Sequence, residues 1–391
     1  MDRVVVVGAG LAGARACQQL RARGYAGGLV LVGAESRPPY DRPPLSKRVL
    51  LGEAEDSSLD PDWCGGAELR LGVTATALRP GVLVTTGGEL GWDGLVLATG
   101  AVPRRIGGAG SGAWVLRTAE DSLRLRAAFV PGARVIIVGA GWIGAEVATA
   151  AARRGCTVTV VEAASAPLSV ALGADVGAQT IPWYAEAGIT LRAGEPVAGL
   201  DGASVTLGSG EVLTADVVVE GIGVRPDLGW LAGSGVQVDP ATGGVAVDAS
   251  CRSSLPGVVA VGDCAARYSP RIGRRVRTEH WDDALRAPEV AAATLLGEEA
   301  VYDPVPYVWS EQFGRYLQWV GWRDGSPAVW RGDPDSDQAW SAAWLAADGR
   351  LAGLLAVGRP RDAVQARRAI DAGTVPDPAR LADPAVPVKD A

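Results

Sequence analysis

One pattern of apolar and polar positions occurs twice along the chain. Residues 4–7 are four valines, and residues 135–138 read Val-Ile-Ile-Val. A glycine-rich turn follows each run, and an alanine-rich segment with helical spacing follows each turn. Short β-branched runs predict buried strands, and apolar positions three and four residues apart predict helices. The sequence therefore predicts two strand–turn–helix units, at a constant offset that also carries Gly24 onto Gly155.

Both turns have the spacing Gly-x-Gly-x-x-Gly. In dinucleotide-binding folds the first glycine allows the tight turn, the second lets backbone approach a pyrophosphate, and the third lets the helix pack on the strand. The phosphates lie at the helix N-terminus, where free N–H groups and the helix dipole favour negative charge. The predicted contacts are Gly8, Gly10, Leu11, Ala12 and Gly13 in the first unit and Gly139, Gly141, Trp142, Ile143 and Gly144 in the second.

An acidic residue follows the next apolar strand of each unit. Residues 29–32 lead to Glu35, and residues 157–161 lead to Glu162. Such a carboxylate can accept hydrogen bonds from ribose hydroxyls. Glu162 would repel the 2′-phosphate of NADP, and residues 163–170 contain no arginine or lysine to pair with one. The second unit is therefore predicted to prefer NAD(H); the alternative is that Glu162 is only a solvated strand end.

Composition narrows the classes of function. The chain is 48% hydrophobic and carries a formal net charge of −7, which argues against nucleic acid as its main partner. No apolar run reaches the roughly 18 residues that a membrane-spanning helix needs. The five cysteines form no CxxC pair and no metal-ligand spacing. We expect a cytoplasmic protein with no metal site and no membrane segment.

Two further apolar strands carry short motifs. Residues 95–101 end in Ala-Thr-Gly-Ala, and residues 258–265 contain Gly262-Asp263. With these motifs the chain resembles the pyridine-nucleotide-disulfide oxidoreductase superfamily. Within it, the chain is most similar to the oxygenase-coupled NADH–ferredoxin reductases, the group of putidaredoxin, rubredoxin and biphenyl-dioxygenase reductases. The stretches that carry this resemblance are residues 39–47, 116–121, 221–226, 279–281 and 309–313.

The resemblance implies an α/β fold like that of glutathione reductase, with two Rossmann-like domains and a small α+β C-terminal domain. The first unit would hold FAD and the second NADH. The implied domains are 1–112 with 228–301 for FAD, 113–227 for NAD, and 302–391 at the C-terminus. Beyond the first glycine turn, the implied FAD contacts are Glu35, Arg42, Lys47, Ala75, Ala98, Thr99, Gly100, Arg117, Gly262, Asp263, Glu279, His280 and Trp281. Beyond the second turn, the implied NAD contacts are Glu162, Ile222 and Gly223.

The chemistry expected of this chain needs no cysteine. Thiol relays require a thiolate beside the flavin, and no cysteine lies between Cys17 and Cys64. The resemblance instead implies catalytic roles for Lys47, Glu146 and Trp281. Lys47 would stabilise anionic reduced flavin and Glu146 would orient the nicotinamide carboxamide, or the two form only a structural ion pair. Trp281 would pack on the isoalloxazine ring or fill the core.

Trp142 departs from the smaller residue expected after the second glycine of the turn. It either gates the nicotinamide pocket or packs the start of the helix.

A basic run precedes Glu279-His280-Trp281 and extends from Arg267 through Arg271, Arg274, Arg275 and Arg277. We expect it to steer an acidic [2Fe–2S] ferredoxin to the flavin edge, an effect that salt would screen. The alternative is a solvated connecting loop.

The C-terminal segment changes in character from about Tyr302. Six of the 13 tryptophans lie at 309, 319, 322, 330, 340 and 344 among short apolar stretches. We predict a small sheet, a helix over 361–370 and an irregular tail from Val375.

The sequence favours a reductase that passes electrons from NADH through FAD to a ferredoxin or rubredoxin serving a P450 or Rieske oxygenase. A flavin NADH oxidase or quinone-type reductase, and a non-enzymatic NADH-sensing flavoprotein, are the alternatives. The particular ferredoxin, the downstream oxygenase and the oligomeric state are left open.

Overall fold

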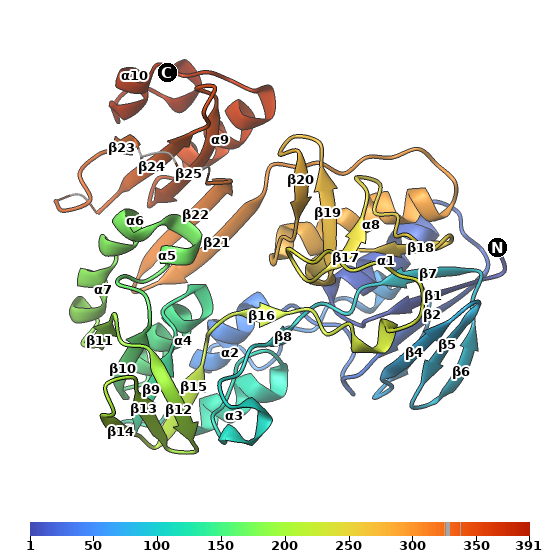
Figure 1. Ribbon diagram of the computed structural model, residues 1–391, viewed down its shortest axis with the longest axis horizontal. Helices are drawn as coiled ribbons and strands as arrows, with labels where there is room; N and C mark the ends of the chain where they lie inside the picture. Colours follow the sequence, from blue (N-terminus) through green and yellow to red (C-terminus); the bar gives the residue numbers. More distant parts are fainter. Residues whose placement is uncertain (324, 326–328, 337) are drawn as a thin grey trace. The chain divides into compact units, whose positions relative to one another are not determined.

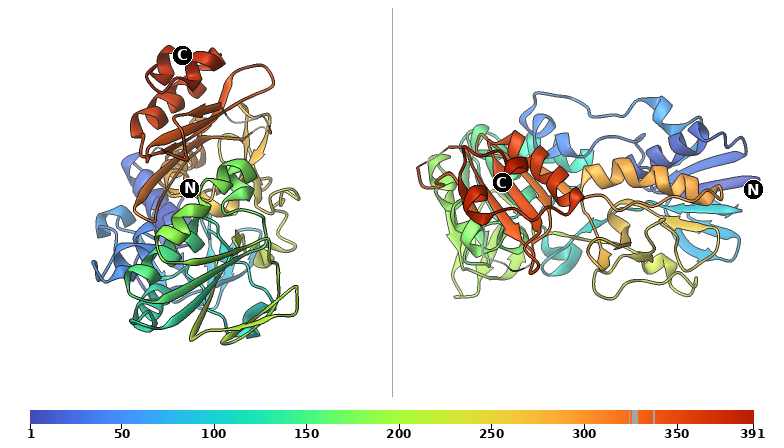
Figure 2. Two further views of the ribbon diagram at one scale, coloured as in Figure 1. Left: turned by 90° about the vertical axis from the view of Figure 1, so that its left-hand side faces the viewer. Right: turned by 90° about the horizontal axis from the view of Figure 1, so that it is seen from above.

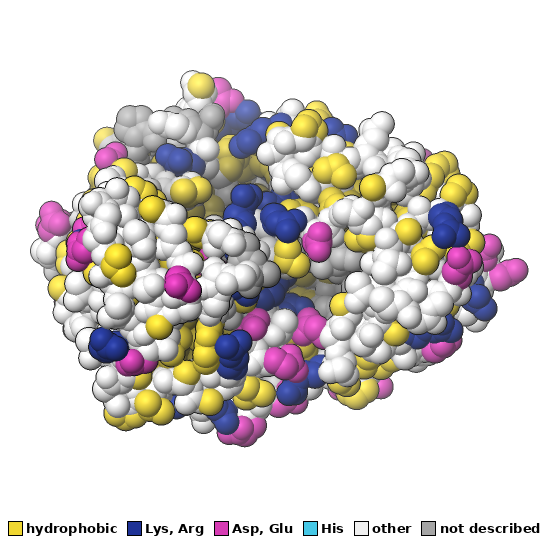
Figure 3. Space-filling view, turned by 60° about the horizontal axis from the view of Figure 1, so that its bottom comes forward, with side chains coloured by type: hydrophobic (Ala, Val, Ile, Leu, Met, Phe, Trp, Pro, Cys, Tyr) yellow, Lys and Arg dark blue, Asp and Glu magenta, His cyan; other side chains and the backbone are white. Residues whose placement is uncertain are grey.

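The computed structural model describes residues 1–323, 325, 329–336 and 338–391 (Figure 1). The chain forms two compact units, each assembled from three stretches. Unit 1 comprises Met1–Asp41, Ser57–Val102 and Val224–Pro304, and unit 2 comprises Arg42–Asp56, Pro103–Gly223 and Val305–Ala391. Two-residue strands β8 (Val102–Pro103) and β16 (Val224–Arg225) lie where the chain passes from one unit to the other. On the face drawn in Figure 3, basic and acidic side chains are interspersed.

Unit 1 is built on a five-stranded parallel sheet in the order β18-β7-β1-β2-β3. Its strands are β1 (Arg3–Val7), β2 (Gly28–Gly33), β3 (Glu68–Leu71), β7 (Gly94–Leu97) and β18 (Val258–Ala260). Val4 and Val6 face helices α1 (Leu11–Ala22) and α8 (Trp281–Leu295), while Val5 and Val7 face the opposite side. Alternate residues of a strand point to opposite faces, so burial of both faces explains the unbroken valine run.

The second face of this sheet is covered by β4 (Ala75–Arg79), β5 (Val82–Thr85) and β6 (Gly88–Gly91), an antiparallel sheet whose leucines join Val5 and Val7 in one core. The remaining strands of unit 1 are β17 (Val245–Val247), β19 (Ala265–Ser269) and β20 (Arg274–Val276). Its short helices are η2 (Pro61–Cys64), η4 (Gly229–Leu231) and η5 (Gly262–Cys264).

Unit 2 repeats this plan. Its parallel sheet has the order β11-β10-β9-β15, from strands β9 (Arg134–Val138), β10 (Thr157–Glu162), β11 (Thr190–Ala193) and β15 (Val217–Glu220). Val135 and Ile137 pack with helix α4 (Trp142–Arg153), and Ile136 and Val138 pack with the antiparallel strands on the other face. Those strands are β12 (Val197–Asp201), β13 (Ser204–Leu207) and β14 (Val212–Thr214).

Short helices surround this second sheet. They are η1 (Pro43–Ser46), α2 (Arg48–Leu51), η3 (Gly108–Ser111), α3 (Ala119–Ala128), α5 (Ser169–Leu172), α6 (Ala174–Ala178) and α7 (Ile181–Glu186). In the described parts of the chain the longest helix is α8, with 15 residues, and none has the length and apolar character needed to cross a bilayer.

The C-terminal part of unit 2 is an antiparallel sheet in the order β21-β22-β25-β24-β23. This part of the chain is drawn in orange and red in Figure 2. Its strands are β21 (Tyr307–Gln312), β22 (Arg315–Gly321), β23 (Val329–Arg331), β24 (Trp340–Leu345) and β25 (Leu351–Val357). Helix α9 (Pro360–Ala372) packs on one face through Ala363, Ala366 and Ile370. The other face carries tryptophans, among them Trp319 and Trp344, with ring centroids 4.9 Å apart.

The predicted fold class, two Rossmann-like parts and a small C-terminal α+β part, is confirmed. The prediction of an irregular tail from Val375 is wrong, because the tail forms α10 (Pro378–Ala382) and η6 (Val388–Asp390). Arg331 explains this order: its fully buried guanidinium donates to the carbonyl oxygens of Leu381, Asp383 and Val386. Such distant backbone partners leave no local sequence signal.

Asp362 balances the buried charge of Arg331. Its Oδ2 accepts hydrogen bonds from Arg331 Nε at 3.2 Å, Ser341 Oγ at 2.9 Å and Arg359 Nε at 2.7 Å. Burial works against the ionised carboxylate, but these donors and the charges of the two arginines outweigh it, so the pKa of Asp362 lies below its ordinary value. A group with a depressed folded-state pKa stabilises the fold at neutral pH, and this contribution is lost as the pH falls through that pKa.

We therefore expect Asp362→Asn to lower the free energy of unfolding by about 3 kcal/mol at pH 7, since it leaves Arg331 buried without its counter-charge. The difference from the unsubstituted protein should shrink in acid, where Asp362 becomes protonated. Denaturant unfolding at several pH values measures both effects. Asp348→Asn, which breaks the exposed pair with Arg350, is the control and should change little. Equal stability of Asp362→Asn and the unsubstituted protein at pH 7 would contradict the assignment.

Candidate functional site

The first glycine turn joins β1 to α1 in unit 1. A Cβ atom at Gly8 would lie 2.1 Å from the carbonyl oxygen of Ala98, and one at Gly13 would lie 1.9 Å from that of Gly8. Gly8 also has a φ of +115°, which L side chains rarely adopt. A Cβ at Gly10 meets nothing within 4 Å. The outer glycines are thus required for close packing, and the middle one faces open space at the start of α1.

The second turn, between β9 and α4 of unit 2, has the same geometry. A Cβ atom at Gly139 would lie 2.6 Å from the carbonyl oxygen of Gly221, and one at Gly144 would lie 2.0 Å from that of Gly139. Gly141 again faces open space. Gly10 and Gly141 are the N-caps of α1 and α4, and neither helix start has a side-chain cap. Each turn therefore presents helix N–H groups beside open space, where an anionic pyrophosphate can bind.

The acid after each second strand is fixed by a hydrogen bond. The Tyr40 hydroxyl donates to the carboxylate of Glu35. Glu162 Oε2 accepts the N–H of Ala140 at 2.7 Å, and its Oε1 accepts the N–H of Ala164 at 2.8 Å. Glu162 is therefore oriented toward the second glycine turn by two backbone donors, which a merely solvated strand end would not require.

Other predicted residues of unit 1 meet around the first turn. Ala98 contacts Gly8, as described, and is followed by Thr99 and Gly100 at the end of β7. A Cβ atom at Gly262 would lie 3.1 Å from Cβ of Ala12, and Asp263 follows it in η5. Ala75 lies at the start of β4. The carboxyl ends of β1, β7 and β18 thus converge on one glycine turn, as expected for ligand sites of parallel sheets.

Trp281 is the first residue of α8, and His280 is the N-cap of that helix. The indole Nε1 of Trp281 donates to Asp41 Oδ1 at 2.9 Å. Burial raises the pKa of Asp41, and the indole donor partly offsets this. Glu279 forms an ion pair with Arg277. The structure thus gives Trp281 a directional contact, in addition to any packing role.

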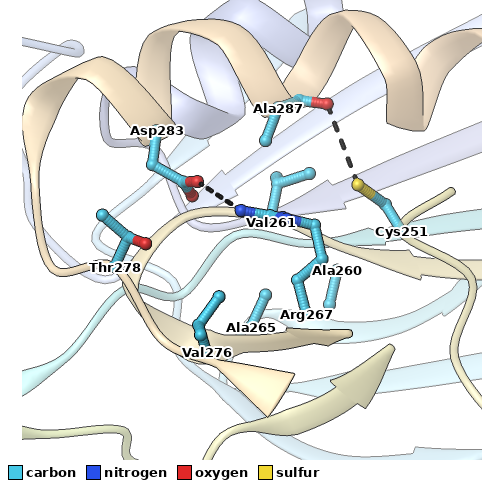
Figure 4. A pocket seen from close by; sticks show the side chains of 9 residues that line it. All are labelled: Cys251, Ala260, Val261, Ala265, Arg267, Val276, Thr278, Asp283 and Ala287. Carbon is cyan, nitrogen blue, oxygen red and sulfur yellow. Dashed lines mark hydrogen bonds and ion pairs between the residues drawn. The ribbon is translucent and has the colours of Figure 1, made fainter. Parts of the chain in front are cut away.

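A buried ion pair in unit 1 involves Asp283, two residues after Trp281 in α8. Arg267 reaches Asp283 of α8 at 3.6 Å, and both line a small cavity with Thr278 and Cys251 (Figure 4). Burial raises the pKa of Asp283 to about 6, and the charge of Arg267 opposes this rise. Arg267 is 5% exposed, so its inclusion in a surface basic run was wrong. The run begins at Arg271, because Arg267 is needed inside to balance Asp283.

The predicted pair of Lys47 and Glu146 exists within unit 2. Lys47 Nζ lies 2.7 Å from Glu146 Oε2 and 3.3 Å from the carbonyl oxygen of Pro43. The side chains are 13% and 3% exposed, respectively. Lys47 Nζ also lies 4.8 Å from the centroid of the Trp309 ring, a cation–π geometry. The pair is therefore desolvated, and the strength of its electrostatic interaction is correspondingly greater than at a surface.

Three contacts of this pair were not predicted as site residues. They are Ser46, whose hydroxyl donates to Glu146 Oε2, Ser310, which donates to Glu146 Oε1 at 2.5 Å, and Trp309. Their only sequence signal was that the stretches around 46 and 309–313 resemble motifs of the reductase group.

The remaining predicted residues of unit 2 fall into two places. Arg42 donates to the carbonyl oxygen of Arg117 at 2.6 Å, so these two predicted FAD contacts are neighbours. Ile222 and Gly223 follow β15, directly after Gly221, which contacts Gly139 of the second turn.

Trp142 is half-buried and packs against the apolar cluster that contains Leu168, Leu172 and Trp319, whereas Ile143 is 45% exposed. Which of the two predicted roles Trp142 has stays a prediction.

Two glycine turns, each with an oriented acid, define a protein with two dinucleotide sites. Comparison with known proteins specifies the family. Residues 2–287 match the family model "Pyridine nucleotide-disulphide oxidoreductase", and residues 307–391 match "Reductase C-terminal". The chain belongs to the pyridine nucleotide-disulphide oxidoreductases.

Similar proteins cover the whole chain. The ferredoxin–NAD(+) reductase component of the anthranilate 1,2-dioxygenase system of Burkholderia cepacia is 41% identical over 405 residues, covering 99% of this chain and 98% of the relative. The crystal structure of Fdr9 matches with a TM-score of 0.93 and 50% identity, covering 99% of each chain. The covalent putidaredoxin reductase–putidaredoxin complex matches with a TM-score of 0.93 and 32% identity, covering 99% of this chain and 97% of the other. This chain is therefore similar to such reductases in sequence and fold over its full length.

The glycine geometry predicts different outcomes for two substitutions in the second turn. Gly141→Val places its side chain in open space, so the free energy of unfolding should change by less than about 1 kcal/mol while NADH binding weakens at least about tenfold. Gly144→Val collides with the backbone of Gly139 and should cost about 3 kcal/mol of stability. Thermal unfolding and NADH titration of the two variants measure the contrast. Unchanged NADH binding by Gly141→Val would contradict the location of the pyrophosphate.

Proposed function

We propose that this protein is a FAD-containing reductase that passes electrons from NADH, through the flavin, to a [2Fe–2S] ferredoxin or rubredoxin that serves a P450 or Rieske oxygenase. The observation that carries the proposal is the pair of glycine turns, in which Gly10 and Gly141 each face open space at a helix start that has no side-chain cap. Full-length similarity to a ferredoxin–NAD(+) reductase component, and to a reductase joined to putidaredoxin, supports the electron acceptor.

The two sites are assigned by their surroundings. FAD is held by the domain of residues 1–112 and 228–301, at the first turn with Glu35, Thr99 and Asp263. NADH is held by residues 113–227, at the second turn with Glu162, Ile222 and Gly223. Residues 302–391 form the third domain. The residues at the first turn would hold an FAD that supplies a hydride acceptor for NADH and a donor of single electrons.

Lys47, Glu146 and Trp281 are the proposed catalytic residues. In these roles the desolvated positive charge of Lys47 would stabilise the negative charge that develops on reduction of the flavin, and Glu146 would accept a hydrogen bond from the nicotinamide carboxamide. Their burial and their 2.7 Å contact support these roles, because a preorganised charge in a low dielectric is worth more than one in water. The indole of Trp281, fixed by Asp41, offers a flat wall for the flavin.

Electrons leave without a thiol relay. Residues 43–49, where such a thiol would lie, contain no cysteine. Cys17, Cys64, Cys251 and Cys264 are buried, and burial raises the pKa of each, which keeps the thiols protonated and unreactive. Five free cysteines also agree with a cytoplasmic location.

NADH is the proposed donor because of Glu162. Its carboxylate is held beside the glycine turn, where it would repel a 2′-phosphate. The nearby Arg192, on the strand next to β10, is engaged in ion pairs with Glu195 and Glu211.

The proposed docking surface for ferredoxin is the β19–β20 hairpin and the loop after it, with Arg271, Arg274, Arg275 and Arg277. Arg274 and Arg275 are exposed on β20. The Arg271 guanidinium donates to the carbonyl oxygen of Asp303 at 3.5 Å, and the Arg277 guanidinium pairs with Glu279. Arg271 and Arg277 are only partly exposed, so we expect the exposed Arg274 and Arg275 to supply most of the steering charge.

Anaerobic stopped-flow mixing of the FAD-loaded protein with NADH and, separately, NADPH tests the proposal. We expect NADH to bleach the flavin at least about tenfold faster than NADPH at equal concentration, because Glu162 excludes the extra phosphate. An acidic [2Fe–2S] ferredoxin should then reoxidise the flavin rapidly. Fast bleaching followed by oxidation only with oxygen or quinone would favour an oxidase or quinone-type reductase. Long-lived reduced flavin with every acceptor would favour a sensor.

Charge reversal at the proposed docking surface should separate the two half-reactions. Arg274→Glu with Arg275→Glu should slow reoxidation by ferredoxin about tenfold or more at low salt, with a smaller effect at high salt. Reduction by NADH should keep its rate. Arg79→Glu with Arg252→Glu, two other exposed arginines of unit 1, is the matched control. Equal loss in both double variants would show that only net charge matters and would contradict a specific surface.

A further inference from the structure

Two buried polar residues of β21, Ser310 and Gln312, extend the Lys47–Glu146 pair. Ser310 Oγ donates to Glu146 Oε1 at 2.5 Å, and Gln312 Nε2 donates to Ser310 Oγ at 2.9 Å. Ser310 is 0% exposed and Gln312 is 1% exposed. Residues two apart in a strand point to the same face, so both side chains reach the same interior. Buried polar side chains are costly unless hydrogen-bonded, and here each bond leads toward Glu146.

The directions of these hydrogen bonds are fixed by chemistry. The amide nitrogen of Gln312 can only donate, so the Ser310 oxygen is the acceptor in that contact. The hydroxyl hydrogen of Ser310 is then free to point at Glu146, whose ionised carboxylate can only accept. Hydrogen bonds are therefore donated in one direction, from Gln312 to Ser310 and from Ser310 to Glu146.

The two carboxylate oxygens of Glu146 have different donors. Oε2 accepts from Lys47 Nζ and from the Ser46 hydroxyl, both on the segment 43–47. Oε1 accepts from Ser310 on the C-terminal sheet. Lys47 and Ser46 fix one oxygen, and Ser310 fixes the rotation of the carboxylate about that point.

The backbone just after β21 is hydrogen-bonded to helix α4. The N–H of Phe313 donates to Thr149 Oγ1 at 3.0 Å, and that hydroxyl donates to the carbonyl oxygen of Ala145 at 2.8 Å. Glu146 and Thr149 lie three residues apart, on adjacent turns of α4. The contacts of Ser310 with Glu146 and of Phe313 with Thr149 therefore hold the end of β21 against α4.

We propose that Ser310, oriented by Gln312, is a positioning residue for hydride transfer: it fixes the orientation of the Glu146 carboxylate toward the nicotinamide carboxamide. The inference rests on the role proposed above for Glu146. It gives the C-terminal sheet a part in the NADH half-reaction. Without the Ser310 hydroxyl, Glu146 stays paired with Lys47 but loses the donor that sets its plane.

The experiment uses the FAD-loaded full chain, with NADH as the probe, in anaerobic stopped-flow. A loss of orientation lowers the limiting rate of flavin reduction more than the affinity for NADH. We expect Ser310→Ala to lower that rate about fivefold with an apparent Kd for NADH within about twofold, and Gln312→Met to have a smaller effect in the same direction. In a Glu146→Gln background, Ser310→Ala should change the rate by less than about twofold, because both substitutions act through one group.

The chain offers a matched control in Ser341. It is also 0% exposed, and its hydroxyl donates to the buried carboxylate of Asp362 at 2.9 Å in the same unit. Ser341→Ala should lower the melting temperature by a similar amount to Ser310→Ala and leave flavin reduction unchanged. If Ser310→Ala fails to bind FAD, Ser310→Cys, which retains volume but is a weaker donor, is measured in its place with the same expected direction.

The outcomes separate this inference from the proposed function. A normal rate in Ser310→Ala alongside a slow Glu146→Gln would overturn the positioning role and leave the function intact. An equal loss from Ser310→Ala in both backgrounds would also overturn it, since the effect would then be general. Failure of NADH to reduce the unsubstituted protein would instead refute the proposed function itself.

Discussion

In each half of this protein a helix start packs closely against the turn before it at a glycine, and the arrangement of both candidate sites depends on this close approach. The start of α1 passes so near the β1 turn that any side chain at Gly13 would overlap the carbonyl oxygen of Gly8. Gly144 and Gly139 repeat this contact in unit 2. Because the helices can approach this closely, their first N–H groups lie at the carboxyl ends of the parallel strands. A larger residue would move the helix start away from the place where phosphates bind.

The same parallel sheets bring the other site residues to these turns. In unit 1, β7 lies next to the first strand and β18 lies next to β7, so Ala98 and Gly262 reach the turn although they are far from it in sequence. In unit 2, β10 carries Glu162 to the second turn, where two backbone N–H groups hold its carboxylate. Strand order, rather than distance along the chain, decides which residues form each site.

Several charged groups in the interior form ion pairs. Lys47 with Glu146, Arg267 with Asp283 and Arg331 with Asp362 each combine opposite charges below the surface. A buried charge without a partner is strongly unfavourable, so each pair ties together segments distant in the sequence. The pairs differ in what surrounds them. Arg331 donates to carbonyl oxygens of the C-terminal tail, a structural arrangement, whereas Lys47 and Glu146 are contacted by hydroxyls and an aromatic ring near the N-terminus of α4.

The sequence alone determined the duplicated α/β plan, because valine runs, glycine spacing and helical periodicity are local signals that each unit repeats. It also indicated both glycine turns, Glu162 and the pairing of Lys47 with Glu146, the last through family resemblance. Only the tertiary structure decided that Arg267 is inside, that the tail from Val375 is ordered by Arg331, and that Ser310 and Gln312 reach Glu146. The physical reason is common to all three: each depends on one polar side chain meeting a partner from a distant segment, and periodicity or spacing carries no record of such meetings.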